Sequence, residues 1–424
     1  METGISSSYS DQFIAQLAGT LPFAHLRDQA WAEFTRLGLP AKKAEEYKYT
    51  PVARYLEKTG VWPQTTHSTI ANLAGINGPE IGGQRVVLVN GKWNAELSTT
   101  HVVPGLTVKS LTQETPTLLG GVNGFSNDSF SALNTAAWTD GVYVRVAKNT
   151  RVGDPITILH IQETNSAPVQ VHTRVFVHLE PGAEATIVHQ TQTLGTHSAF
   201  HTVVDEAVVE AGSRLNYYKL QTDTGKSIEV WNSTIRQADD SHVDTFTLTT
   251  DGELVRNNFH IEINGQRCES HFHGLYLLQG DTLADNHTVV DHQKPNSFSN
   301  ELYKGIMADK SKGVFNGKIF VRPHAQKTNA YQSNRNILLT DTASVNTKPQ
   351  LEIWADDVKC SHGCTSGQLD EEALFYLRSR GLAEGTAKAM LLYAFAAETL
   401  ETIKNEPLKR YIENLVGNRL HKNF

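Results

Sequence analysis

Cysteine is scarce in this chain, with only Cys268, Cys360 and Cys364 among 424 residues. So few cysteines in so long a chain, and an odd number of them, exclude a disulfide-stapled module and fit free thiols in a reducing compartment. Nowhere do about 18 apolar residues run together, and the N-terminus lacks the basic and apolar segments of a signal peptide. We therefore expect a soluble, cytoplasmic protein with no membrane partner.

An excess of basic residues is also missing, since 38 Lys and Arg stand against 45 Asp and Glu for a net charge of −7. A nucleic-acid partner is therefore not expected. The sequence GVFNGKI at 313–319 lacks the spacing and the hydroxyl of a phosphate-binding Walker loop, and neither GxSxG nor HExxH occurs. We expect no ATP hydrolysis and no hydrolase of these classes in this chain.

Hydrophobic periodicity divides the chain into three regions, which we place at 1–80, 81–366 and 367–424. The first has helical stripes at 13–17 and at 26–37, where Gly38 ends the second stripe, and then a connection at about 60–82. From Arg85 onward the period is two, in runs such as RVVLV, ITILHI and TRVFVHL, with one short helix expected at 129–137. Three helical stripes follow, at 371–380, at 387–395 and behind Pro407, and we expect them to cap the preceding β region.

Turns in the middle region recur near one or two units of about 15 residues, a spacing typical of a repeat. Their spacings are 30, 28, 25, 15, 30, 32 and 15 residues, counted from Gly182 to Asp357. The third residue after each turn is mostly small or apolar, which predicts an inward column: Ala185, Leu215, Val243, Cys268, Leu283, Gly313, Val345 and Cys360. The column two residues further on is mixed and ends at His362. This pattern predicts a stacked β-helix, and a pair of β-sandwiches is the alternative.

The run KCSHGC at 359–364 holds the best candidate site. Cys360 and His362 share a strand face about 6.5–7 Å apart, and thiolate and imidazole both suit iron. Lys359 would lower the thiol pKa if its charge lay near the sulfur. Because Cys360 also falls in the inward column, where a buried cysteine behaves as a small hydrophobe, His362 is the better single candidate. A cluster usually takes four ligands, so a second subunit would supply the others.

A second group of histidines surrounds CESHFH at 268–273. Alternation places His271 and His273 on one face and Cys268 on the other, so a site on this strand alone is awkward. Stacked coils could instead gather His260, His273 and His287 around one metal ion. The competing interpretation, which we favour, is that these histidines are satisfied within the solenoid or exposed on its faces.

Residues 336–382, which include LEIWADDVKCSHGCTSGQLDEEALFYL, resemble the C-terminal signature of the SufB/SufD family of iron–sulfur cluster assembly proteins. FSALNTAAWTDGVYVRV at 130–146 and EEYKYTPV at 45–52 resemble the same family. The chain length, the few cysteines and the KCSH run are similar to its SufD branch. The resemblance implies a right-handed parallel β-helix between helical ends.

The resemblance also implies a non-catalytic scaffold of the SUF system. A SufB-like subunit would pair with it through the β-helices, and a SufC-like ATPase would dock on the C-terminal helical region. A transient iron–sulfur cluster would form near the pairing surface, with no tightly bound cofactor in the isolated chain. The family's cluster-side residues fall on Cys360 and His362, while Cys364 is either a spare ligand or a core residue.

The main hypothesis is a scaffold that itself contributes ligands to the cluster, and two alternatives to it stay open. The chain could be purely architectural, with all cluster ligands supplied by its partner. It could instead be a β-fold enzyme with a mononuclear metal at His260, His273 and His287. Whether it forms a homodimer when the partner is missing is also open.

Overall fold

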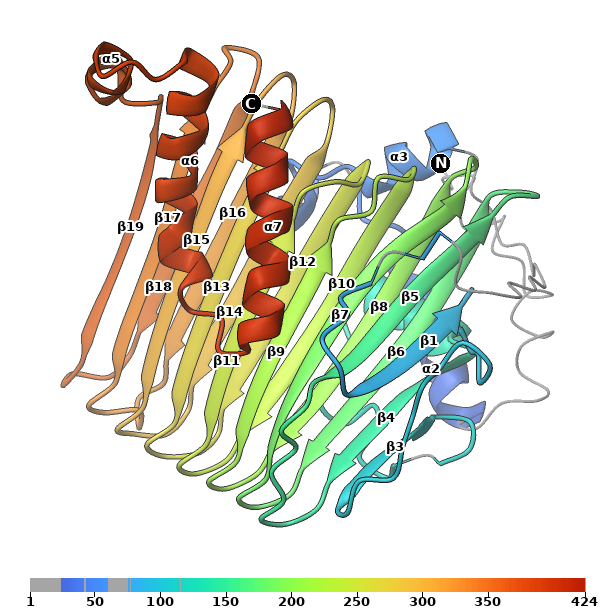
Figure 1. The fold of residues 1–424 in the computed structure, drawn as a ribbon. Coiled ribbons are helices and arrows are strands. Elements are labelled where there is room, and N and C mark those ends of the chain that lie inside the picture. Colours follow the sequence, from blue (N-terminus) through green and yellow to red (C-terminus); the bar gives the residue numbers. More distant parts are fainter. Residues whose placement is uncertain (1–23, 42, 60–74, 77, 115, 424) are drawn as a thin grey trace.

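Two parallel β-sheets face each other across the centre of the molecule, as the computed structural model shows (Figure 1). The structure describes residues 24–41, 43–59, 75–76, 78–114 and 116–423. Sheet A has ten strands, in the order β19-β17-β15-β13-β11-β9-β7-β5-β1-β2, and sheet B has nine, in the order β18-β16-β14-β12-β10-β8-β6-β4-β3. Apart from β2 and β3, which pair antiparallel, every strand runs parallel to its neighbours.

The strands of sheet A are β1 (Gln84–Val89), β2 (Lys92–Trp93), β5 (Ile156–Thr164), β7 (Glu184–Gly195), β9 (Arg214–Gln221), β11 (His242–Thr249), β13 (Glu269–Leu278), β15 (Phe298–Met307), β17 (Asn329–Leu338) and β19 (Lys359–Gly367). Those of sheet B are β3 (Leu106–Ser110), β4 (Asp140–Val146), β6 (Val169–Leu179), β8 (Ala199–Val209), β10 (Ser227–Gln237), β12 (Leu254–Ile263), β14 (Leu283–His292), β16 (Lys312–Val321) and β18 (Ser344–Ile353). From β4 onward successive strands alternate between the sheets, so one coil contains two of the 15-residue units. The predicted parallel β-helix is confirmed.

The inward column is correct in kind but loses register in two places. Ala185, Leu215 and Val243 are in register, as predicted. On the next coil the residue in register with Val243 is Ser270, not the predicted Cys268. The turn residue Gly265 lies four residues before the start of β13, whereas Asp240 lies only two residues before the start of β11. In sheet B the inward residue is Ala284, while Leu283 faces outward beneath the N-terminal helices. Corner lengths therefore differ from coil to coil.

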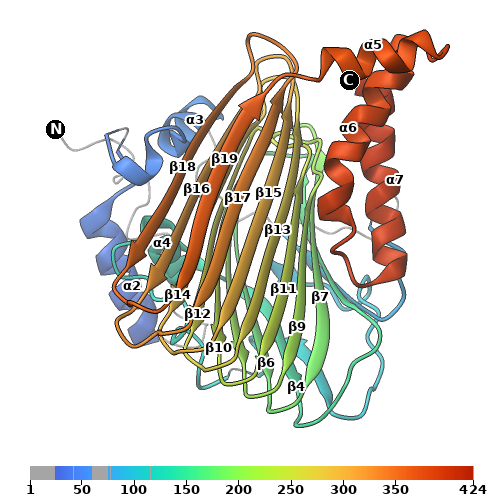
Figure 2. The same cartoon turned by 90° about the vertical axis from the view of Figure 1, so that its left-hand side faces the viewer.

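The N-terminal helical region covers the outer face of sheet B, on the side opposite the C-terminal helices (Figure 2). It contains α2 (Ala24–Leu37) and α3 (Val52–Thr59), with a 3-10 turn at Glu45–Tyr47, and α4 (Ser129–Ala137) joins them on this face. The Asp128 carboxylate caps α4 by accepting a hydrogen bond from the Ser131 amide. The helices expected at 26–37 and 129–137 are confirmed, whereas the stripe at 13–17 and most of the 60–82 connection lie outside the described residues.

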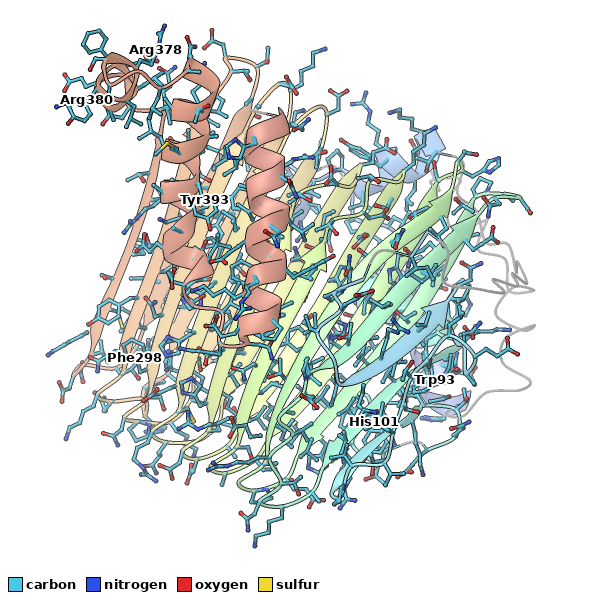
Figure 3. The ribbon with its side chains drawn as sticks, viewed as in Figure 1. Trp93, His101, Phe298, Arg378, Arg380 and Tyr393 are labelled. Carbon is cyan, nitrogen blue, oxygen red and sulfur yellow. The ribbon has the colours of Figure 1, made fainter. Side chains whose placement is uncertain are left out.

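Three C-terminal helices, α5 (Glu371–Ser379), α6 (Glu384–Leu400) and α7 (Glu406–Asn423), confirm the expected stripes. The expectation that they cap the end of the β region is wrong. Leu392 and Ile412 pack instead against outward-facing residues of sheet A such as Phe246, because strands β9 to β15 carry an apolar outer face there. Helix α5, which contains Arg378 and is followed by Arg380, projects past the sheets (Figure 3).

We expect one buried ion pair on sheet B to stabilise the fold strongly. Arg174 lies 2.7 Å from Glu206, with 1% and 0% of the two side chains exposed. Arg174→Ala leaves the buried Glu206 carboxylate with backbone N–H donors but no opposite charge, and should lower the free energy of unfolding by about 3–5 kcal/mol. Arg236→Ala breaks a partly exposed pair with Glu262 on the same face and should cost less than about 1 kcal/mol. Urea unfolding followed by circular dichroism measures the free energy of unfolding of both variants. Equal losses of stability would contradict the strong contribution assigned to the Arg174–Glu206 pair.

Candidate functional site

The C-terminal end of the solenoid is an open edge. Strands β18 and β19 end their sheets, so within the described residues each has a neighbour on one side only, β16 and β17 respectively. An edge strand presents unpaired N–H and C=O groups that can pair with another chain. Figure 2 shows both strands at the near face of the molecule, with α6 and α7 to one side.

The side chains of Cys360, His362 and Cys364 lie on the inward face of β19. Their register partners on β17 are all buried, whereas Tyr331, which alternates with them, is 37% exposed. These partners are Ala330, Gln332 and Asn334. Because no coil covers β19, Cys360 is only partly buried, and His362 and Cys364 are exposed. The predicted placement of Cys360 and His362 on one face of the last strand is therefore confirmed.

The environment of Cys360 does not activate its thiol. Burial raises the pKa of Cys360, and a backbone hydrogen bond at Ala330 acts in the opposite direction. Alternation places Lys359 on the outer face of β19, away from the sulfur. The conditional expectation that Lys359 lowers this pKa is therefore not met in the isolated chain.

Beneath His362 a polar column leads into the solenoid. His362 is in register with Gln332, and Gln332 with Glu301. Gln332 Nε2 donates to Glu301 Oε2 at 2.6 Å. Burial raises the pKa of Glu301 to about 7, and the hydrogen bond from Gln332 acts against that shift. Sequence reasoning missed this column, although a step of 30 residues back from His362 would have reached Gln332.

The layer below Cys364 is polar as well. Asn336 Nδ2 donates to Asn334 Oδ1 at 2.7 Å, and Asn334 Nδ2 donates to the Tyr276 hydroxyl at 3.0 Å. On the opposite strand, β18, the inward face carries the apolar residues Val345, Leu351 and Ile353 and one hydroxyl, that of Thr347, and Ile353 is 39% exposed. The open end thus has a polar, sulfur-bearing half on sheet A and a mostly apolar half on sheet B.

The second predicted group does not come together. His260 and His287 lie on the outer face of sheet B, on neighbouring strands, whereas His273 lies on the outer face of sheet A. The two sheets and the core between them separate His273 from the other two. The described residues therefore offer no mononuclear site made of these three histidines.

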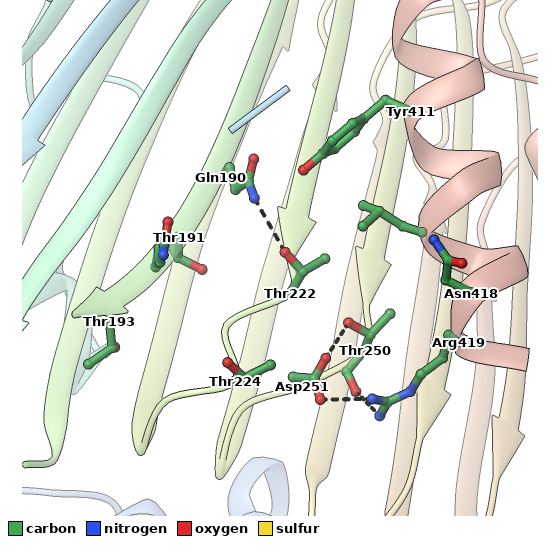
Figure 4. A pocket seen from close by; sticks show the side chains of 12 residues that line it. Gln190, Thr191, Thr193, Thr222, Thr224, Thr250, Asp251, Tyr411, Asn418 and Arg419 are labelled. Atoms are coloured by element: carbon green, nitrogen blue, oxygen red, sulfur yellow. Dashed lines mark hydrogen bonds and ion pairs between the residues drawn. The ribbon is translucent and has the colours of Figure 1, made fainter. Parts of the chain in front are cut away.

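A pocket of about 380 Å³ lies between α7 and the outer face of sheet A (Figure 4). Its charged side chains pair with each other, since Arg419 Nη1 lies 3.0 Å from Asp251 Oδ1. Arg419 Nη2 also donates to the Thr250 carbonyl at 2.7 Å. These contacts fasten α7 to the end of β11, so we interpret the pocket as part of the helix–sheet contact.

Comparison with known proteins identifies the family of this chain. The SUF system FeS cluster assembly, SufBD core domain matches residues 160–395, and the SufBD protein N-terminal region matches residues 10–158. The chain belongs to the SufB/SufD family. It is 31% identical to the iron–sulfur cluster assembly protein SufD of Escherichia coli, over 92% of this chain and 91% of that protein.

Two further relatives extend the comparison. A SufBD family protein of Synechocystis is 31% identical over 90% of this chain and 88% of its own length. The chloroplastic protein ABCI7 of Arabidopsis thaliana is 27% identical over 97% and 91%. This SufD-like chain therefore has a role in SUF iron–sulfur cluster assembly. Among the described residues, no helix is both long and apolar enough to cross a membrane.

The three thiols should differ in reactivity according to burial. In the monomeric chain Cys364 is exposed, Cys360 partly buried and Cys268 buried, so alkylation should proceed in that order. The raised pKa of Cys360 means that its rate keeps increasing to a higher pH than that of an ordinary exposed thiol. Timed iodoacetamide labelling with peptide mass spectrometry measures this order. Labelling of Cys268 as fast as Cys364 would contradict the placement of the open end.

Proposed function

We propose that the chain is a scaffold subunit whose open end pairs with a SufB-like β-helix and presents Cys360 and His362 to a nascent iron–sulfur cluster. The observation that carries this proposal is an exposed edge whose inward face holds two thiols and an imidazole. Elsewhere in the described solenoid, inward residues are covered by the next coil. A second subunit can therefore reach the inward side chains of β19 at this end.

Strand β19 is the better edge for pairing with a partner strand. Pro349 interrupts β18 with a residue that has no backbone N–H. Strand β19 contains no proline, so its free edge offers an unbroken series of donors and acceptors. Addition of a partner strand at such an edge gives affinity through main-chain hydrogen bonds.

The ligand set at this end is incomplete for a cluster. Cys360, His362 and Cys364 provide at most three donors, and alternate residues on a strand are about 6.5–7 Å apart. Because a cluster usually takes four ligands, the SufB-like subunit supplies the others, and the cluster is transient at the subunit boundary. This incompleteness also explains why we propose no tightly bound cofactor in the isolated chain.

ATP hydrolysis belongs to a partner in this proposal. The GVFNGKI sequence lies within β16, which pairs with β14 and β18, so its backbone is not a loop that could cradle phosphates. The C-terminal helices carry exposed apolar side chains: Phe375 is 74% exposed, Tyr376 55% and Met390 48%. We assign this surface to a SufC-like ATPase.

Substitution of His362 tests the role of the open end in cluster chemistry. In anaerobic reconstitution with the SufB-like and SufC-like partners, His362→Ala should lower cluster content at least about 10-fold, since loss of even a group that only orients a ligand costs about 10–100-fold in metal affinity. His101→Ala removes an exposed histidine far from β19 (Figure 3) and should retain wild-type content. Iron and sulfide analysis measures both. Wild-type content in His362→Ala would favour the purely architectural alternative.

Two matched substitutions separate the pairing surface from the ATPase surface. Ile353→Asp places a carboxylate at the open end and should weaken pairing with the SufB-like subunit more than about 10-fold, because burying an unpaired charge costs several kcal/mol. ATPase binding should be unchanged. Phe375→Asp should weaken binding of the SufC-like ATPase and leave pairing with the SufB-like subunit unchanged. Analytical ultracentrifugation of each pair measures the affinities, and loss of both contacts in either variant would contradict the separation.

A further inference from the structure

Four chemically reactive side chains form a square on the outer face of sheet A, at the start of β11 and β13. His242 is in register with Glu269, and Asp244 with His271. Neighbouring strands are about 4.8 Å apart and alternate residues on a strand about 6.5–7 Å. The sequence signal is HxD at 242–244 followed one coil later by ExH at 269–271. The scaffold role uses none of these residues.

The donor atoms of three of these residues converge. One ligand atom each from His242, Glu269 and His271 lies within 4.8 Å of the other two. His242 Nδ1 is 3.1 Å from Glu269 Oε2. Two ligands of one tetrahedral ion, each at about 2.1 Å from it, lie about 3.4 Å apart, so this pair is already near ligand spacing.

Asp244 positions the His242 ring. The Asp244 Oδ2 atom lies 2.8 Å from His242 Nε2, which leaves Nδ1 directed toward Glu269. A carboxylate that accepts a hydrogen bond from the second nitrogen is the usual partner of a metal-binding histidine, because it fixes the tautomer and the ring orientation. The square therefore contains a ligand together with the group that orients it.

From this geometry we infer that His242, Glu269 and His271 form a binding site for one divalent transition-metal ion of the zinc type. Imidazole and carboxylate suit such ions, and three protein ligands leave one coordination position open. His242 and His271 are half-buried and Glu269 is exposed, so the site is accessible from solvent. The His271 ring lies 5.5 Å from that of Phe298, which marks the place in Figure 3 on the lower part of sheet A.

Metal binding to the untagged full-length chain tests this site directly. A Cys360→Ser, Cys364→Ser background removes the exposed thiol and the partly buried one, which would compete for the metal. Isothermal titration with Zn²⁺ should then give one equivalent, and Co²⁺ should give visible absorption without thiolate charge-transfer bands. His271→Ala should weaken binding at least about 100-fold, and Asp244→Asn, which removes only the orienting carboxylate, about 10–100-fold.

His273→Ala is the matched control. His273 lies two residues beyond His271 on the same face, with its ring 6.3 Å from that of His271, but outside the converging donors. The affinity of the His273→Ala variant for Zn²⁺ should equal that of the chain with only the two cysteine substitutions. Circular dichroism should show that every variant is folded. Absence of a Zn²⁺ equivalent in the folded background, or equal losses in His271→Ala and His273→Ala, would overturn the site. The site does not depend on the proposed function.

Discussion

Parallel main-chain pairing between successive coils is the constraint on which the rest of this structure depends. Each coil satisfies the backbone of the one before it and covers its inward side chains, so the interior of the solenoid can hold polar groups as well as apolar ones. The last coil has no successor among the described residues. Its unpaired backbone and its uncovered side chains arise from the same cause, and for that reason the open edge and the candidate ligands coincide.

The polar column under His362 gives this end a chemical character that the edge alone would not have. Glu301, with a pKa raised to about 7 by burial, lies two coils below His362 and hydrogen-bonds to the intervening Gln332. In an apolar column, His362 would lie over a dry core. Here the ring continues a series of hydrogen-bonding groups, and in the proposed complex this series would keep a polar environment next to Cys360 and Cys364.

The sequence predicted local structure well and long-range register poorly. The helix at 129–137 follows from its Asp128 cap, and the shared face of Cys360 and His362 follows from strand alternation. The Glu301–Gln332 column was missed because corner lengths vary, and a count from turn residues shifts by one or two positions. An amphipathic stripe shows that α6 and α7 bury one face, but only the fold shows that sheet A covers it.

Hydrogen–deuterium exchange of β19, alone and with the SufB-like partner, tests the central claim most directly. Amides of residues 359–367 at the free edge should exchange quickly in the isolated chain and become strongly protected in the complex. The antiparallel β1–β2 pair at the opposite end should be unaffected. Unchanged exchange in β19 together with protection of β1 and β2 would show that the partner binds at the other end, and would contradict this account.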